Sequence, residues 1–171
     1  MAFDTFLFLE GISGESSAMI LQAPIQGVKP FEITSWNFGA ANPSSVGSGA
    51  GGLSAGKVHV SSFNVQKKSE NASPQLFLNC CTGQHISKGA VIMRKATGGA
   101  GKQQTFWQFM FTEVMVDSIQ WSGHAGGDDT PEESISFAFA KVDVQYWVQD
   151  PIKGDMNKGT AAAWDITKVI A

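Results

Sequence analysis

Charged residues are scarce in this sequence, and neither sign dominates. Only 16% of the 171 residues are charged, and 12 basic residues stand against 15 acidic ones, giving a formal net charge of −3. Binding to nucleic-acid phosphates or anionic lipid requires a stripe of lysine and arginine, whereas the basic residues here are scattered along the chain. The composition therefore excludes nucleic acid and membranes as main partners.

Cysteine and long apolar runs are also lacking. The two cysteines, Cys80 and Cys81, are adjacent, and neighbouring residues of a helix point in different directions, so we expect no disulfide between them. This favours folding in a reducing cytoplasm. No run approaches the ~20 apolar residues that span a membrane, and the N-terminus carries Asp4 where a signal peptide has basic residues.

Glycine and aromatic residues, in contrast, are abundant. The chain has 19 glycines, 12 phenylalanines and 5 tryptophans, a profile typical of strands joined by glycine-rich loops. A chain of this length buries roughly 70% of its unfolded surface in one core. We therefore expect one mainly β domain that spans residues 1–171.

Alternating apolar residues predict where the strands lie. In residues 3–10, Phe6 and Phe8 oppose Leu7 and Leu9, and both faces look covered. Residues 149–163 read as a connector. The expected strands are residues 3–10, 31–39 (with Phe31, Ile33 and Ser35 on one face), 57–67, 89–95, 105–121, 134–148 and 164–171.

The phase of this alternation changes within two of the strands. In residues 57–67 the apolar positions pass from Val58 and Val60 to Phe63 and Val65. In residues 134–148 they pass from Ile135, Phe137 and Phe139 to Val142, Val144, Tyr146 and Val148. Such a change indicates a β-bulge or a strand that turns a corner between two sheets. Two such strands favour a two-sheet β-barrel over a flat sheet.

Only one segment has clear helix signals, at about residues 74–82. Ser73 is expected to cap its start, Pro74 suits its first turn, and Gly83 suits the left-handed residue that follows a helix. A helix this short is unstable alone and must pack on the strands. Its apolar face is predicted to comprise Leu76, Phe77 and Cys80.

Residues 40–56 consist almost entirely of glycine, serine and alanine and carry no charge. A loop this long inside a compact domain is uncommon. Two interpretations remain open at this point: a flexible hairpin connection, which costs little to insert, or a functional loop.

One glycine motif and one acidic motif each suggest a binding site, but neither meets the requirements of that site. Gly47, Gly49 and Gly52 match G-x-G-x-x-G, but that fingerprint must open a helix, and a strand follows here. The acidic motif is the turn at residues 128–133. It offers fewer oxygen ligands than a calcium loop needs at its set spacings. We expect a solvated hairpin at Asp128, Asp129, Glu132 and Glu133.

Histidine and cysteine give no site either. His59, His85 and His124 lack a second ligand at metal spacing. Cys80 or Cys81 with His85 would be a nucleophile and a base, but a cysteine on the apolar face of a helix is usually inert. We therefore expect no catalytic, metal-binding or cofactor-binding residue.

The order of motifs in residues 56–96 is more informative. GKVHVSSFNVQKKSENASPQLFLNCCTGQHISKGAVIMRKA resembles the haemolysin-coregulated protein (Hcp) family, which forms the tube of bacterial type VI secretion systems. Similar segments cover nearly the whole chain: residues 4–6, 14–16, 35–39, 111–123, 133–146 and 163–166.

The resemblance implies a β-barrel with a flanking helix whose copies form a hexameric ring. Such rings stack into a tube that meets a baseplate, a sheath and a spike protein, can carry effectors in its lumen, and leaves the cytoplasm for the medium or a target cell without a signal peptide. Asn37 falls where similar proteins have a lumen-facing residue, and Trp36 is expected to pack inward. The equivalent of the glycine-rich loop contacts the adjacent ring; here it comprises Ser44, Ser45, Val46, Gly47, Ser48, Gly49, Ala50, Gly51, Gly52 and Leu53.

Two other functions stay open. A barrel with exposed aromatic residues could bind a small ligand or carbohydrate, and an enzyme that uses Cys80 ranks third.

Overall fold

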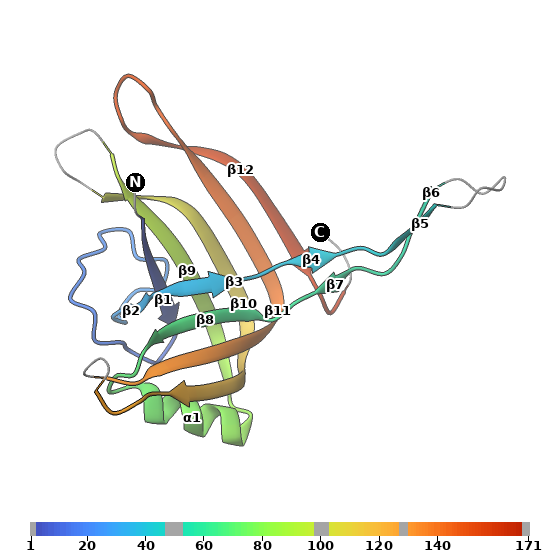
Figure 1. The fold of residues 1–171 in the computed structure, drawn as a ribbon. Coiled ribbons are helices and arrows are strands. Elements are labelled where there is room, and N and C mark those ends of the chain that lie inside the picture. Colours follow the sequence, from blue (N-terminus) through green and yellow to red (C-terminus); the bar gives the residue numbers. More distant parts are fainter. Residues whose placement is uncertain (1–2, 47–52, 98–102, 127–129, 169–171) are drawn as a thin grey trace.

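The computed structural model describes residues 3–46, 53–97, 103–126 and 130–168, which form a mainly β structure (Figure 1). One antiparallel sheet contains eight of the strands. Its order is β2 (Phe31–Ile33), β1 (Asp4–Leu9), β9 (His85–Ala96), β10 (Gln103–Ser122), β11 (Glu132–Gln149), β8 (Phe63–Lys68) and β3 (Ser35–Asn37), with β12 (Met156–Asp165) also paired to β11.

The segment that contains β2 and β3 closes this sheet into a nearly complete barrel. β2 pairs with β1, and β3 pairs with β8 at the other end of the sheet. Thr34 lies between them, and its N–H donates to the Gln66 carbonyl at 2.8 Å. The expected single strand 31–39 is therefore two strands, and the change at Thr34 leaves Ser35 exposed instead of on the buried face of Phe31 and Ile33.

Both faces of β1 are covered, as its sequence predicts. Leu7 and Leu9 belong to the main core inside the barrel. Phe6 and Phe8 belong to a second cluster on the outer face, which residues 18–28 cover.

The phase change in β11 is confirmed at Val142 and Val144, whereas Tyr146 and Val148 are exposed. The change marks a corner that three strands share. Glu113 of β10 lies opposite Ala140 of β11 and Ser87 of β9, as the flanking pairs show. Its φ of 52° is the one positive value among the described residues other than glycine. On one side of the corner β11 pairs with β8, and on the other side it pairs with β12. The second change falls at the break between β7 (His59–Val60) and β8.

Aromatic side chains fill the barrel. The ring of Phe63 lies 5.0 Å from that of Phe111 and 5.3 Å from that of Phe109, and Phe139 lies 4.7 Å from Phe111. Edge-to-face and tilted contacts at these distances stabilise a core beyond the burial of area alone. The interior is therefore packed with side chains.

The helix, α1 (Ser73–Thr82), lies along the outside of the barrel (Figure 1). Ser73 is its first residue and not its cap, which is Ala72; the Ser73 hydroxyl instead accepts the Glu70 N–H at 2.9 Å. Gly83 ends the helix in the left-handed conformation, with φ of 64°, as predicted.

The apolar face of α1 was predicted only in part. Leu76 is fully buried and Cys80 partly so, but Phe77 is 48% exposed. Successive residues of a helix are ~100° apart, so the buried face follows spacings of three and four. This face comprises Ser73, Leu76, Asn79 and Cys80.

The C-terminal strand begins earlier than expected. β12 takes in most of the predicted connector, and of the predicted strand 164–171 it includes only Trp164 and Asp165. Asp165 ends it because its carboxylate accepts the N–H groups of Thr167 and Lys168, both at 3.0 Å, in a turn.

Candidate functional site

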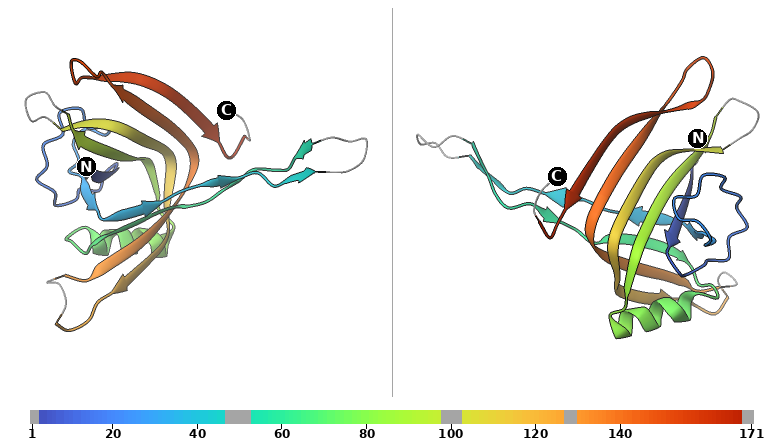
Figure 2. Two further views of the ribbon diagram at one scale, coloured as in Figure 1. Left: turned by 45° about the horizontal axis from the view of Figure 1, so that its top comes forward. Right: turned by 180° about the vertical axis from the view of Figure 1, so that it is seen from behind.

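A two-stranded ribbon projects from the barrel between β3 and β8 (Figure 2). β4 (Ala40–Ala41) pairs with β7, and β5 (Ser44–Val46) pairs with β6 (Leu53–Ala55) further out. Hydrogen bonds from Ser61 N–H to the Gly39 carbonyl at 2.9 Å and from Gly56 N–H to the Pro43 carbonyl at 2.8 Å link these ladders. The described part of the glycine-rich segment is therefore a paired ribbon.

The composition of this ribbon explains its shape. A Cβ atom at Gly56 would lie 2.4 Å from the Pro43 carbonyl oxygen, so only glycine lets the two chains approach here. An isolated two-stranded ribbon is marginally stable in water. The ribbon therefore presents backbone groups that another surface would stabilise. Gly47, Ser48, Gly49, Ala50, Gly51 and Gly52, the G-x-G-x-x-G match among them, lie outside the described residues.

Asn37 lies at one end of a polar row on the barrel surface. The Asn64 side-chain amide donates to Asn37 Oδ1 at 2.8 Å, and the Ser136 hydroxyl donates to Asn64 Oδ1. These residues are register partners on β3, β8 and β11. Asn37 is exposed, whereas Trp36 packs inward and stacks on Phe63 at 5.7 Å, as its strand phase predicts.

The candidate nucleophile and base have separate partners. The Cys80 thiol lies 3.9 Å from the Asp117 carbonyl oxygen, and His85 Nδ1 lies 3.5 Å from a carboxylate oxygen of Glu113. Within the described ranges, no group of three histidine, cysteine or acidic side chains could hold a metal ion.

The expectation of a solvated acidic hairpin is wrong for Glu133. Asp128 and Asp129 lie outside the described residues, and Glu132 is exposed, but Glu133 is 1% exposed. The register of β8 and β11 turns Glu133 toward Lys67, which is also buried. This acidic cluster is therefore partly a structural element of the core.

The buried ion pair that results was not predicted from the sequence. Lys67 Nζ lies 2.5 Å from Glu133 Oε1 and 2.8 Å from Glu70 Oε1, and the Trp121 indole N–H donates to Glu133 Oε2 at 2.8 Å. Lys67 continues the inward phase of Phe63 and Val65. This shared phase indicates that the Lys67 side chain is buried. A buried lysine needs a charged partner, so the pattern could have pointed to an ion pair.

Two carboxylates with lowered pKa values hold turns. The N–H groups of Lys153 and Ile152 donate to Asp150 and hold the pKa of its carboxyl below the ordinary value. The Thr167 hydroxyl, at 2.6 Å, is the main cause of the lowered pKa of Asp165. Both turns flank β12 and fix where this strand begins and ends.

A family model described as "Type VI secretion system effector, Hcp" matches residues 6–146. The Pseudomonas aeruginosa protein called Protein hcp1 is 31% identical over 102 residues, which span 60% of this chain and 59% of that relative.

Two solved structures are similar over nearly their whole length. One, described as the structure of a type six secretion system protein, has a TM-score of 0.82 at 30% identity and covers 99% of both chains. The other, Hcp1 from Salmonella typhimurium, has a TM-score of 0.72 at 27% identity and covers 99% of this chain and 98% of that one. None of the described residues forms a helix long and apolar enough to cross a bilayer.

Proposed function

Because the chain belongs to the Hcp family of type VI secretion proteins, we propose that it is a tube subunit whose copies close into hexameric rings that stack. The projecting ribbon is the observation that carries this proposal. It has little to pack against in a single copy, and its uncharged small residues allow another protein surface to approach its backbone closely. The ribbon is the proposed contact between rings.

The contents of the barrel favour a structural role over ligand binding. Phe63, Phe109, Phe111 and Phe139 fill the interior, so a small ligand or carbohydrate would need an outer surface. A structural subunit needs a rigid core and two different contact surfaces, because a ring closes through head-to-tail contacts.

Electron microscopy of the purified protein tests ring formation. We expect rings with a central hole and six subunits, and sedimentation should give the matching mass. A protein that remains monomeric at every concentration would overturn the proposal.

Deletion of residues 44–54 tests the ribbon. The expected variant still forms rings, because the described part of the deleted segment pairs within the outer ribbon, where Ser44, Ser45 and Val46 face Ala55, Ser54 and Leu53, but its rings no longer stack and it is absent from the culture supernatant. Loss of the rings themselves would show that the ribbon supports ring closure.

Secretion is the third part of the proposal. The subunit leaves the cytoplasm with the sheath, the spike protein and the baseplate as partners, and no signal peptide takes part. It should appear in the supernatant only when the contractile apparatus is intact, and appearance without that apparatus would contradict this route.

Asn37 is proposed to contact secreted effectors in the lumen. Its side-chain oxygen is used by Asn64, so its amide N–H groups are the donors it offers to a cargo. Asn37→Asp keeps the acceptor for Asn64 and removes these donors. We expect this variant to form rings that retain fewer co-purifying effectors by mass spectrometry; unchanged retention would exclude the contact.

A further inference from the structure

A groove of about 720 Å³ lies on the outer face of the barrel. Its floor is formed by the ends of β9, β10, β11 and β12, and residues 19–22 form one wall. Arg94, Gln103, Gln104, Gln108 and Trp147 line the floor.

The lining is rich in uncharged amides. Gln104 is held by the Thr97 hydroxyl at 3.1 Å and the Met156 N–H at 3.1 Å, and Gln103 donates to Asp4 at 2.6 Å. Gln22 and Gln108 have no side-chain hydrogen bond within the described part of the chain. A side-chain amide offers both donors and an acceptor, so these two glutamines match the N–H and C=O groups of an extended backbone.

The wall is apolar and exposed. Met19 is 84% exposed and Leu21 is 87% exposed, although both are large apolar side chains. Exposed apolar groups next to polar ones are typical of a contact surface. Among the described residues of the lining, the only charged side chains are those of Arg94 and Asp155, which oppose each other in sign, so the groove suits an uncharged occupant.

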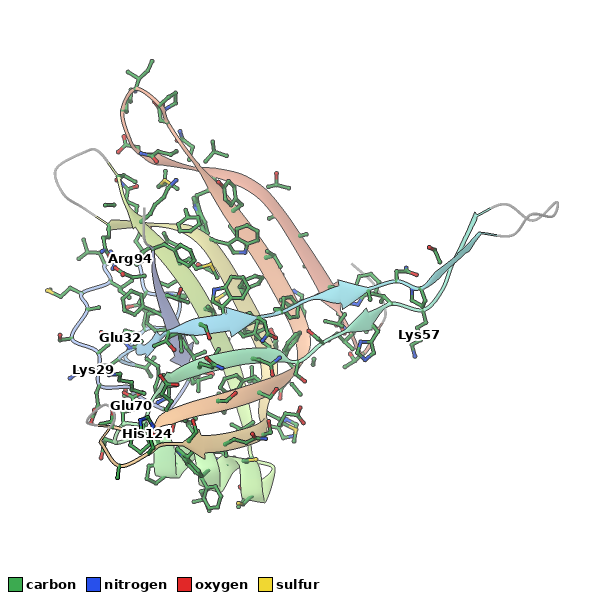
Figure 3. The ribbon with its side chains drawn as sticks, viewed as in Figure 1. Lys29, Glu32, Lys57, Glu70, Arg94 and His124 are labelled. Carbon is green, nitrogen blue, oxygen red and sulfur yellow. The ribbon has the colours of Figure 1, made fainter. Side chains whose placement is uncertain are left out.

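The ribbon of a second copy has the matching chemistry. Residues 40–56 carry no charge and are mostly glycine, serine and alanine, which leave the backbone accessible. Figure 3 shows Arg94, in the groove, on the opposite side of the molecule from Lys57, which lies on the projecting ribbon. A contact between opposite sides of identical copies is head-to-tail and repeats without limit.

We propose that this groove receives the ribbon of a copy in the next ring, with Gln22 and Gln108 hydrogen-bonding its backbone and Met19 and Leu21 covering it. The inference rests on the proposed stacking of rings and names its acceptor site.

Charge pairs test the contact. Ser44 is exposed at the start of β5 in the outer part of the ribbon, and Gln108 lies in the groove. Placing a lysine at either position puts an unpaired charge in an uncharged contact. Ser44→Lys and Gln108→Lys should each raise the concentration at which rings associate end to end by about tenfold or more. Mixing Ser44→Lys rings with Gln108→Glu rings should restore association, because opposite charges then meet.

Two controls separate folding from docking. Gln84→Lys adds the same charge at an exposed position outside the groove lining and the ribbon, and should leave association unchanged. All variants should form single rings and unfold at the temperature of the parent protein.

Disulfide trapping identifies the occupant. In a Cys80→Ser, Cys81→Ser background, a protein with Ser44→Cys is mixed with one that carries Gln108→Cys. Oxidation should link the two chains only under conditions in which rings stack. If Gln108→Lys rings stack normally and the cysteine variants give no cross-link, the groove is not the acceptor site, and the proposed function still stands. Absence of rings in the parent protein would overturn both.

Discussion

Lys67 Nζ lies 2.5 Å from a carboxylate oxygen of Glu133, and neither side chain reaches solvent. Lys67→Met should lower the free energy of unfolding by about 3–5 kcal/mol, because it leaves a buried carboxylate without its cation. Urea denaturation measures the change. Lys141→Met is the matched control: its pair with Asp143 is 3.1 Å long but about 40% exposed, so we expect a loss within about 1 kcal/mol. Equal losses in the two variants would show that burial does not decide the effect.

A double variant separates charge burial from packing at the same site. Lys67→Met with Glu133→Met removes both charges, and it should be more stable than Lys67→Met alone. Part of the loss should remain, since the Trp121 indole N–H loses its acceptor on Glu133. A double variant less stable than the single one would contradict this account.

Neighbouring helix residues should respond very differently to truncation. Leu76 is fully buried, so Leu76→Ala should cost about 2–5 kcal/mol in unfolding free energy. Phe77 is 48% exposed and contacts Trp121 at a ring distance of 5.5 Å, so Phe77→Ala should cost only about 0.5–1.5 kcal/mol. Thermal unfolding of the two variants gives the comparison, and a larger loss at Phe77 would place it in the core.

The helix shows which part of the fold can be predicted from sequence. Gly83 and Leu76 follow from local rules, a left-handed residue after a helix and a spacing that faces the core. The cap does not, because the loop before Ser73 decides it: the Ser73 hydroxyl accepts the Glu70 N–H. Phe77 lies ~100° around the helix from Leu76, so it stays half exposed and contacts Trp121 of β10 instead of the core.

The strands show a similar division. The alternation in β1 and the phase change in β11 locate the covered faces and the corner of the barrel. The limits of β12 could not be predicted, because residues 156–163 become a strand only through pairing with β11. The two proposed contact surfaces differ in the same way. The segment around Ser44 can be recognised from its composition, whereas the groove with Gln108 cannot, because it unites segments far apart in the sequence.

The turn at Asp150 should depend on pH. Its carboxylate accepts the N–H groups of Lys153 and Ile152, which lower its folded pKa. The stabilisation that the ionised Asp150 carboxylate gives to the folded state is therefore fully present above the unfolded pKa of about 3.9. It is lost as the pH falls through the lower, folded pKa. In an NMR titration the amide signals of these two residues should move with a midpoint below about 3.9, and Asp150→Asn should abolish this movement. A midpoint at or above the ordinary value would contradict the hydrogen bonds.

Glu113 provides a test of the corner of the barrel. Its φ of 52° costs a residue with a Cβ atom about 1–2 kcal/mol, while glycine adds about 0.5–1 kcal/mol of unfolded-state entropy. Glu113→Gly should therefore leave the free energy of unfolding unchanged or raise it by up to about 1.5 kcal/mol. Glu113→Val should lower it, because a β-branched residue tolerates positive φ least.

Thr112→Gly is the control for the corner, since Thr112 is the exposed neighbour of Glu113 in the same strand and has no positive φ. It should lose about 0.5–1 kcal/mol of unfolding free energy, the usual effect of glycine inside a strand. The loss of the Glu113 contact to His85 has little weight in this comparison, because both side chains are more than half exposed. If Glu113→Gly and Thr112→Gly lose the same stability, the backbone at Glu113 is not strained. The three strands would then turn this corner through pairing alone.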